Sequence, residues 1–271
     1  MGEDRLITSL TNDTVKAVRA LHMRKQRDAT GTFLAEGLKF IGEALDQGHA
    51  PRLLLVGQDA RPHPLLDRAR AETAKAGGEV VLVTHPILEK ISRRENPQTV
   101  LGVFRQTYTP LDQVDASRSP CWVALEQVRD PGNLGTIIRT ADSAGCGGVV
   151  LIGDCVDPFS VEAVRATMGS VFAVSITRTT PDAFLSWREQ WGGSVIGTRL
   201  DATAGYRSCE LKAPALILMG NEQAGLTDRL ASACDVNVKI PMRGRADSLN
   251  LAVATGVMVY AVTDAAYGSS L

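Results

Sequence analysis

Three short segments in the second half of the chain combine glycines with polar side chains in a way that suits ligand binding. They read DPGNLGTIIRTA over 130–141, LMGNEQAGL over 218–226 and IPMRGRADSLNLAVA over 240–254. Each segment lies at the carboxyl end of an apolar run, and a helical pattern follows it. Ligands of open α/β sheets bind where the strands end and the helices begin. Three such junctions in one chain indicate a single site at the carboxyl ends of several strands.

The first segment carries the features of an anion-binding helix start. A Pro-Gly turn leads to Asn133, which we expect to cap the helix and leave free N–H groups that favour a phosphate. Arg139 follows two turns later. Taken alone, the same pattern also fits an ordinary strand-to-helix turn followed by a surface arginine. The glycine spacing is not the G-x-G-x-x-G fingerprint of dinucleotide-binding enzymes.

The second and third segments add a carboxylate, a hydroxyl and an amide. Glu222 can accept a hydrogen bond from a ligand hydroxyl, although an acid in the first turn of a helix also stabilises the helix dipole. In the third segment, Asp247 or Ser248 is a suitable N-cap for the last helix. That role leaves Asn250 unexplained, and an amide at a helix start suits a ligand contact better than a core position.

Apolar runs around these segments predict the elements that position them. The runs alternate with helical stretches, and uninterrupted apolar strands of this kind are typical of a parallel sheet covered on both faces. We therefore predict an α/β fold for this half of the chain, with a mostly parallel sheet. The expected strands are 121–125, 148–152, 172–176, 194–197, 215–219 and 236–240.

The first half of the chain predicts a smaller α/β domain. Apolar residues from Val15 to Leu45, Phe33 among them, have helical spacing, and short apolar runs follow at 53–56, 80–83 and 100–104. The stretch 107–120 is polar and contains prolines, so we expect a linker there. The predicted organisation is a domain over 1–106, a linker over 107–120 and a second domain over 121–271.

Composition is that of an ordinary globular protein, and the formal net charge is −1. A nucleic-acid surface must therefore be a local patch. One basic strip lies near the N-terminus, and a solvated helix face explains it about equally well. The five cysteines and four histidines are scattered without metal-ligand spacing, so we expect no metal, and no apolar run is long enough for a membrane helix. The strip comprises Lys16, Arg19, His22, Arg24, Lys25 and Arg27.

Taken together, the three segments resemble the SpoU/TrmH-type RNA 2′-O-ribose methyltransferases of the SPOUT superfamily. The resemblance covers 121–265 and rests on N-x-G-x-x-x-R, G-N-E-x-x-G and I-P-M-x-G-x-x-x-S-L-N, in that order. It extends more weakly to the first domain, which looks like the substrate RNA-binding domain often fused in front of this catalytic domain. That likeness favours an RNA-binding role for Lys16, Arg19, Arg24, Lys25 and Arg27.

The resemblance implies an enzyme that methylates a ribose 2′-hydroxyl with S-adenosyl-L-methionine as cofactor. It also implies a trefoil knot in the C-terminal domain, a cytoplasmic location and a homodimer paired near the helix over 249–260. Ribosomal RNA is favoured over transfer RNA as the substrate. The catalytic positions carried over are Asn133, Arg139, Glu222, Ser248 and Asn250, and the donor contacts are Gly220, Ile240 and Leu249.

Two other classes of protein fit the sequence less well. A non-catalytic RNA-binding protein on the same scaffold would have lost the motif residues, whereas all of them are present here. An NAD-dependent dehydrogenase would carry the dinucleotide fingerprint, which this sequence lacks. The sequence alone does not identify the RNA or the nucleotide, nor does it separate a housekeeping role from antibiotic resistance.

Overall fold

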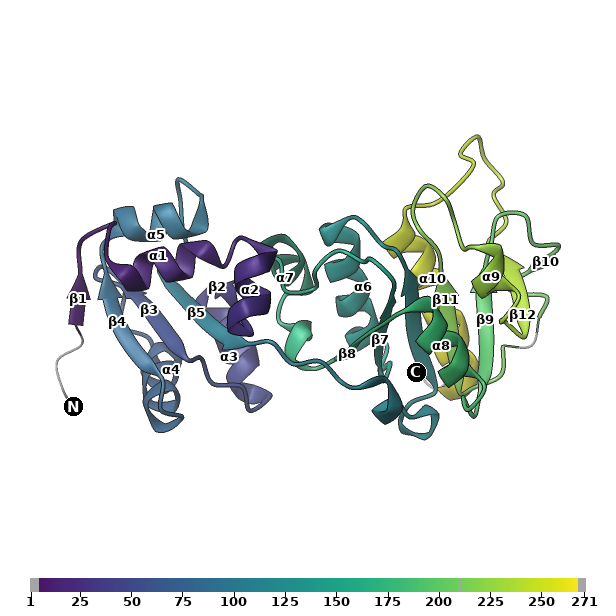
Figure 1. The fold of residues 1–271 in the computed structure, drawn as a ribbon, viewed down its shortest axis with the longest axis horizontal. Helices are drawn as coiled ribbons and strands as arrows, with labels where there is room; N and C mark the ends of the chain where they lie inside the picture. The colour runs from purple at the N-terminus through teal and green to yellow at the C-terminus, as the bar shows by residue number, and fades with distance from the viewer. Residues whose placement is uncertain (1–4, 210, 268–271) are drawn as a thin grey trace. The chain divides into compact units, whose positions relative to one another are not determined.

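The computed structural model describes residues 5–209 and 211–267, and the chain divides into two compact units (Figure 1). The first unit contains the chain up to Gln106 together with Phe159–Phe172, and the second contains Thr107–Pro158 and the chain from Ala173 onward. We expected all residues after Pro120 to belong to one domain. The structure differs for Phe159–Phe172, because the rings of Phe159 and Phe172 pack on Phe33 of the first unit, with centroids 4.8 and 5.8 Å away.

The first unit is built around a five-stranded sheet in the order β1-β4-β3-β5-β2. Strands β1, β4 and β3 are parallel, whereas β5 runs antiparallel to both β3 and β2. Figure 1 shows α1 and α5 on one face of this sheet and α3 and α4 on the other. The strands are β1 Arg5–Ile7, β2 Thr32–Glu36, β3 Leu53–Gly57, β4 Glu79–Val83 and β5 Val100–Arg105. The helices are α1 Asp13–Ala20, α2 Arg24–Thr30, α3 Leu38–Asp46, α4 Pro64–Lys75, α5 His85–Ser92 and α7 Val161–Thr167.

Strand β2 corrects the helical interpretation of the N-terminal region. Phe33 fitted a helical spacing in the sequence, but it lies in a strand that pairs with β5 and faces Phe104. Gly31 ends α2 in the left-handed conformation at φ 61°, which turns the chain into the strand. Here the pairing of Phe33 with a strand that is distant in the sequence outweighs the helical spacing of the neighbouring apolar residues.

The second unit contains a seven-stranded sheet in the order β10-β12-β9-β11-β6-β7-β8, and all of its pairings are parallel. This confirms the predicted α/β class. The sheet is covered on one face by α6 and α10, and on the other by α8 and α9, which pack on Trp122, Val195 and Leu216. The strands are β6 Cys121–Glu126, β7 Gly148–Ile152, β8 Ser175–Thr179, β9 Ser194–Thr198, β10 Ala204–Gly205, β11 Ala215–Met219 and β12 Val236–Lys239. The helices are α6 Pro131–Ser143, α8 Pro181–Arg188, α9 Asp228–Ala231 and α10 Leu251–Tyr267.

Two segments of the second half differ from expectation. The run 172–176 is not one strand, because Phe172 closes a 3-10 turn and β8 begins only at Ser175. The expected linker 107–120 is folded onto the second unit. The Thr109 N–H donates to the Ile176 carbonyl at 2.8 Å, and Val114 is buried in the same core as Trp122.

Candidate active site

The three polar segments meet at the carboxyl ends of parallel strands and line one cavity of about 620 Å³. The first segment follows β6 into α6, the second follows β11, and the third connects β12 to α10. Thr198 and Arg199, at the end of β9, complete the wall. The cavity therefore collects residues that are more than 100 positions apart in the chain, as the strand junctions predicted. Of the predicted site residues, those that line it are Asn133, Gly220, Glu222, Ile240, Ser248, Leu249 and Asn250.

Asn133 joins the three segments through its side-chain amide. Its Nδ2 donates to Glu222 Oε1 at 3.3 Å, and its Oδ1 accepts from Asn250 Nδ2 at 2.8 Å. One amide can hold both partners at once because it offers a donor and an acceptor on the same planar group. The resulting chain Glu222–Asn133–Asn250 fixes the mutual position of the loops that surround the cavity.

Glu222 is held in place by further donors. Its oxygens accept the backbone N–H groups of Arg129 and Asp130, each at 3.3 Å. Glu222 lies in the turn after β11 and not within a described helix, so it does not act as the first-turn acid of α9. Three N–H donors therefore hold this carboxylate in place between the first and second segments.

The caps of the two helices at the site differ from expectation. Asp130, not Asn133, is the N-cap of α6, and its carboxylate accepts the Asn133 N–H at 2.6 Å. Asn250, not Asp247 or Ser248, caps α10, because its Oδ1 accepts the N–H groups of Ala252 and Val253 at 2.9 and 3.3 Å. Asn250 therefore has two functions: it starts the last helix and it contacts Asn133.

The loop after β11 is folded tightly against itself. The backbones of Asn221 and Gly225 exchange two hydrogen bonds, at 3.0 and 2.9 Å, and Gly225 has a φ of 71°. A Cβ at Gly220 would lie 2.0 Å from the Leu226 nitrogen, so only glycine fits there. The Asn221 amide anchors the loop by donating to the Gln127 carbonyl at 2.7 Å. The loop presents backbone groups to the cavity in a fixed arrangement.

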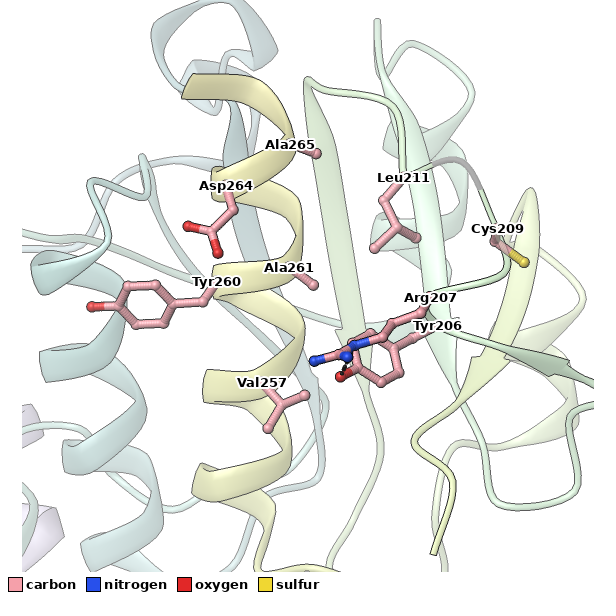
Figure 2. A pocket seen from close by; sticks show the side chains of 9 residues that line it. All are labelled: Tyr206, Arg207, Cys209, Leu211, Val257, Tyr260, Ala261, Asp264 and Ala265. Atoms are coloured by element: carbon pink, nitrogen blue, oxygen red, sulfur yellow. Dashed lines mark hydrogen bonds between the residues drawn. The ribbon is translucent and has the colours of Figure 1, made fainter. Parts of the chain in front are cut away.

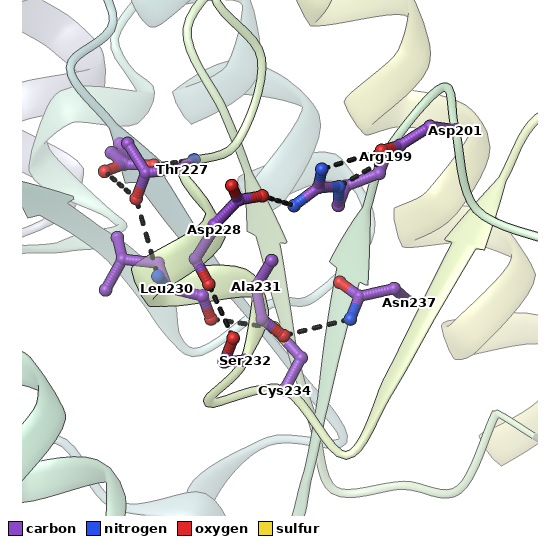
Figure 3. A network of polar contacts seen from close by, with 10 residues as sticks. Arg199, Asp201, Thr227, Asp228, Leu230, Ala231, Ser232, Cys234 and Asn237 are labelled. Carbon is purple, nitrogen blue, oxygen red and sulfur yellow. Dashed lines mark hydrogen bonds and ion pairs between the residues drawn. The ribbon is translucent and has the colours of Figure 1, made fainter.

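Two anchoring groups near the site escaped the sequence analysis. Glu126, at the end of β6, is 3% exposed, and its two oxygens accept the Thr227 N–H and hydroxyl, each at 2.8 Å. Arg199 bridges Asp201 and Asp228 with contacts of 2.7 to 2.8 Å (Figure 3). The hydrogen bonds from Arg199 lower the pKa of Asp201. An apolar strand ending in a glutamate was the only sequence signal for Glu126.

Arg139 is the one predicted catalytic residue that does not line the cavity. It lies on α6 with an exposed side chain. Among the residues that the structure describes, its guanidinium makes no ion pair. The adjacent Thr140 faces Gly256 of α10, with 3.7 Å between the Thr140 methyl and a Cβ built at Gly256. Arg139 is therefore a solvent-facing cation on the helix that begins at the site.

Only some residues of the basic strip in the first unit are exposed. Lys16, Arg24 and Lys25 are exposed and Arg19 is half-buried. Arg27 is 3% exposed, and its Nη1 donates to the Leu21 carbonyl at 2.7 Å. The prediction that Arg27 contacts RNA is therefore wrong, because its buried guanidinium binds a backbone carbonyl in the connection between α1 and α2.

The cavity is suited to a small molecule with both apolar and polar parts. Met219, Ile240 and Leu249 offer apolar surface, while the loop backbone, the Asn250 amide and Glu222 offer donors and acceptors. Ligand pockets of this kind combine an apolar lining with a few fixed polar groups. In the described residues we find no cluster of His, Cys, Asp or Glu side chains that would hold a metal ion, and no helix long and apolar enough to span a membrane.

Fold and cavity together define a class of protein. Residues 120–260 match the model of the SpoU rRNA Methylase family, and residues 12–102 match that of the MRM3-like substrate binding domain. The chain belongs to the SpoU family, which confirms the resemblance carried by the three segments.

Individual relatives extend over nearly the whole chain. The 23S rRNA (guanosine(2553)-2′-O)-methyltransferase RlmP of Bacillus subtilis is 32% identical over 94% of this chain and 97% of its own length. A crystal structure of an AdoMet-bound rRNA methyltransferase from Sinorhizobium meliloti is 46% identical, with a TM-score of 0.90 over 96% of this chain and 98% of that one. The SpoU methyltransferase AviRb of Streptomyces viridochromogenes, in complex with AdoMet, is 28% identical with a TM-score of 0.84, over 95% of this chain and 99% of that one.

Proposed function

We propose that this protein is an enzyme that transfers a methyl group from S-adenosyl-L-methionine to a ribose 2′-hydroxyl of ribosomal RNA. The observation that carries the proposal is the Asn133 bridge, which assembles the three family segments around one cavity. The relatives named above are a 23S rRNA 2′-O-methyltransferase, an AdoMet-bound rRNA methyltransferase and an AdoMet-bound SpoU methyltransferase. A transfer RNA substrate is the alternative within the family.

The cavity residues fit the methyl donor. Gly220 and the folded loop 220–225 present backbone groups, and Ile240 and Leu249 present apolar surface for a nucleoside. When bound, S-adenosylmethionine supplies an electrophilic methyl group, so the protein has to bring the ribose to it and help the 2′-hydroxyl lose its proton. We assign donor contacts to Gly220, Ile240 and Leu249.

The remaining motif residues orient the site and meet the RNA. Glu222, Asn133 and Asn250 hold the loops in register through their hydrogen-bond chain, and Ser248 lies on the third loop beside them. Arg139 is assigned to the RNA. A guanidinium with a pKa above about 12 is a poor base, so we infer that it stabilises a developing alkoxide or holds a neighbouring phosphate.

The first unit is proposed to bind the substrate RNA. Support comes from the match of residues 12–102 to a substrate binding domain and from the exposed cations Lys16, Arg24 and Lys25, together with the half-buried Arg19. Phosphate contacts supply much of the affinity of such surfaces. The same proposal places the enzyme in the cytoplasm, where ribosomal RNA is found.

We also propose the trefoil knot that the family implies. After β12 the chain passes through the loop 240–250 and returns under β11 and β6 as α10. The loops 219–225 and 240–250 line the same cavity, so the returning segment passes close to the loop after β11. This arrangement supports a threaded connection at the donor site.

A homodimer through α10 is the expected assembly. The small residues of α10 do not supply a free surface, because Gly256 faces Thr140 of α6 in the same chain and Ala252 is buried. The support lies elsewhere on the helix, where Val253 and Tyr260 are 54% and 46% exposed. Figure 2 shows the Tyr260 ring pointing from α10 away from Tyr206 and Arg207, residues that line one cavity with it. Exposed apolar surface of this kind is typical of interfaces.

Sedimentation velocity at micromolar concentration is expected to show a dimer. Tyr260→Asp should shift the protein toward monomer, because the substitution places a charge in an apolar contact. Glu72→Gln, on α4 of the first unit, is the control and should leave the dimer intact. A wild-type monomer with full methyl transfer would contradict this assembly.

Donor binding tests the enzyme itself. Calorimetric titration with S-adenosylmethionine should give one donor per subunit, because the three segments form one cavity in each chain. A chelator should not change the result, because methyl transfer from a sulfonium needs no metal. If the folded protein binds no donor, either with or without RNA, the result would count against an enzyme and in favour of a non-catalytic RNA-binding protein.

A further inference from the structure

Residues of α1 and α5 line a groove on the first unit. Figure 1 shows these two helices on the face of the sheet opposite α3 and α4. The walls of the groove carry four cations against one carboxylate. Lys16 and Arg19 come from α1, and Lys90 and Arg93 come from α5 and its C-terminal cap. The carboxylate is Glu89, which lies 3.4 Å from His85. The cations on α5 were not among those selected from the sequence.

Most of this positive charge is not used within the protein. Lys16 contacts Asp13 at 3.1 Å, in a pair that is largely exposed. Within the described part of the chain, the charged groups of Arg19, Lys90 and Arg93 make neither an ion pair nor a hydrogen bond. Burial lowers the pKa of His22, although its Nε2 donates to the Ile91 carbonyl at 2.7 Å, so we do not count His22 among the cations of the groove. The groove therefore has a net attraction for anions.

Arg93 occupies a backbone conformation that favours glycine. Its φ is 57°, and its N–H donates to the Glu89 carbonyl, which ends α5 in a left-handed cap. A side chain other than glycine is strained there by roughly 1 kcal/mol. The residue at this position is nevertheless an arginine with an exposed side chain.

The groove also offers an apolar surface next to its charges. Met23 is 54% exposed at its edge, and Ala20 lies beside it. A groove lined by cations from two helices and by apolar side chains suits a nucleic-acid strand, which offers phosphates together with sugars and bases.

We propose that the groove between α1 and α5 binds the sugar-phosphate backbone of the substrate RNA and that Lys90 and Arg93 are RNA-contacting residues. The proposal rests on the function proposed above, and it extends the RNA surface from the strip around α1 and α2 into a groove between α1 and α5. Because the contacts are to phosphates, they position the RNA and do not select its sequence.

The test uses the full chain and a 23S ribosomal RNA transcript as the probe, with filter binding over a series of potassium chloride concentrations. The variant is Lys90→Gln with Arg93→Gln. The control, Arg68→Gln with Lys75→Gln, removes the same two charges from α4 on the opposite face. We expect the groove variant to bind on the order of tenfold more weakly at low salt, with a salt slope shallower by about 1.4. The control should match the wild type.

Arg93→Gly separates the RNA contact from folding. Glycine relieves the strain at φ 57°, so this variant should be at least as stable as the wild type and still bind the transcript more weakly. Equal affinity and equal salt slope in the wild type and the groove variant would overturn the proposal. If the wild type methylates the transcript in that case, the proposed function survives and only the groove fails. A wild type that binds neither donor nor transcript would overturn both.

Discussion

Replacing Arg139 by alanine should abolish methyl transfer while leaving donor binding and the fold nearly unchanged. The side chain is exposed on α6, makes no ion pair in the described residues and lies outside the cavity, so its loss removes nothing that holds the donor. Alanine is also the best residue for a helix interior. Loss of one charge-assisted contact to the reacting ribose costs about 2 to 4 kcal/mol in the transition state, which is some tens-fold to a thousand-fold in rate.

Single-turnover transfer of labelled methyl to RNA measures this effect, beside calorimetric donor affinity for the same variant. Arg139→Lys distinguishes a planar guanidinium contact from a simple positive charge, because lysine keeps the charge and loses the paired donors. Turnover at the wild-type rate in Arg139→Ala would place the reacting ribose away from α6, even with the family assignment intact.

Replacing Asn250 by alanine should weaken both donor binding and turnover. Its Nδ2 holds Asn133 at 2.8 Å and its Oδ1 caps α10, so the variant loses the link between the first and third segments and also the helix cap. The loss of the cap alone costs about 1 kcal/mol in the free energy of unfolding. Because the loop 240–250 lines the cavity, we expect a donor affinity on the order of tenfold lower, which is about 1.4 kcal/mol of binding free energy.

Asn250→Ser is the matched variant, because serine is an equally good cap but its short hydroxyl does not reach Asn133. Urea unfolding should show the stability loss in Asn250→Ala only, and donor titration should show weaker binding in both. Wild-type donor affinity in Asn250→Ser would mean that the Asn133 bridge does not shape the donor site.

The buried strands and the location of the site were predictable because their signals are local and strong. The runs 148–152 and 215–219 became β7 and β11 with the same bounds, since strands covered on both faces read as uninterrupted apolar stretches. The three polar segments converged because parallel strands end at the same edge of the sheet. The strands and the location of the site could both be predicted from patterns within short stretches of the sequence.

The roles of individual polar residues were less accessible. Asp130 and Asn133 are both good caps, and the sequence does not tell which one adopts the extended backbone that a cap requires. Arg27 looked like its exposed neighbours, yet a carbonyl six residues earlier gives its guanidinium a buried acceptor. Lys90 and Arg93 are distant in the sequence from the N-terminal basic strip, and they lie beside it only because α5 packs next to α1 in the folded chain. Phe159–Phe172 left the expected domain because an aromatic cluster in the other unit accepts two of its rings.

The most direct test of the proposed activity is a map of 2′-O-methylated nucleotides in ribosomal RNA, made by mass spectrometry on cells with and without this protein. We expect that one methylated ribose disappears with the protein, that the wild type restores it and that Arg139→Ala does not. Identical ribosomal RNA maps in the two kinds of cell, with a methylated ribose lost instead from transfer RNA, would contradict the ribosomal substrate. Identical maps for both RNA classes would contradict the activity itself.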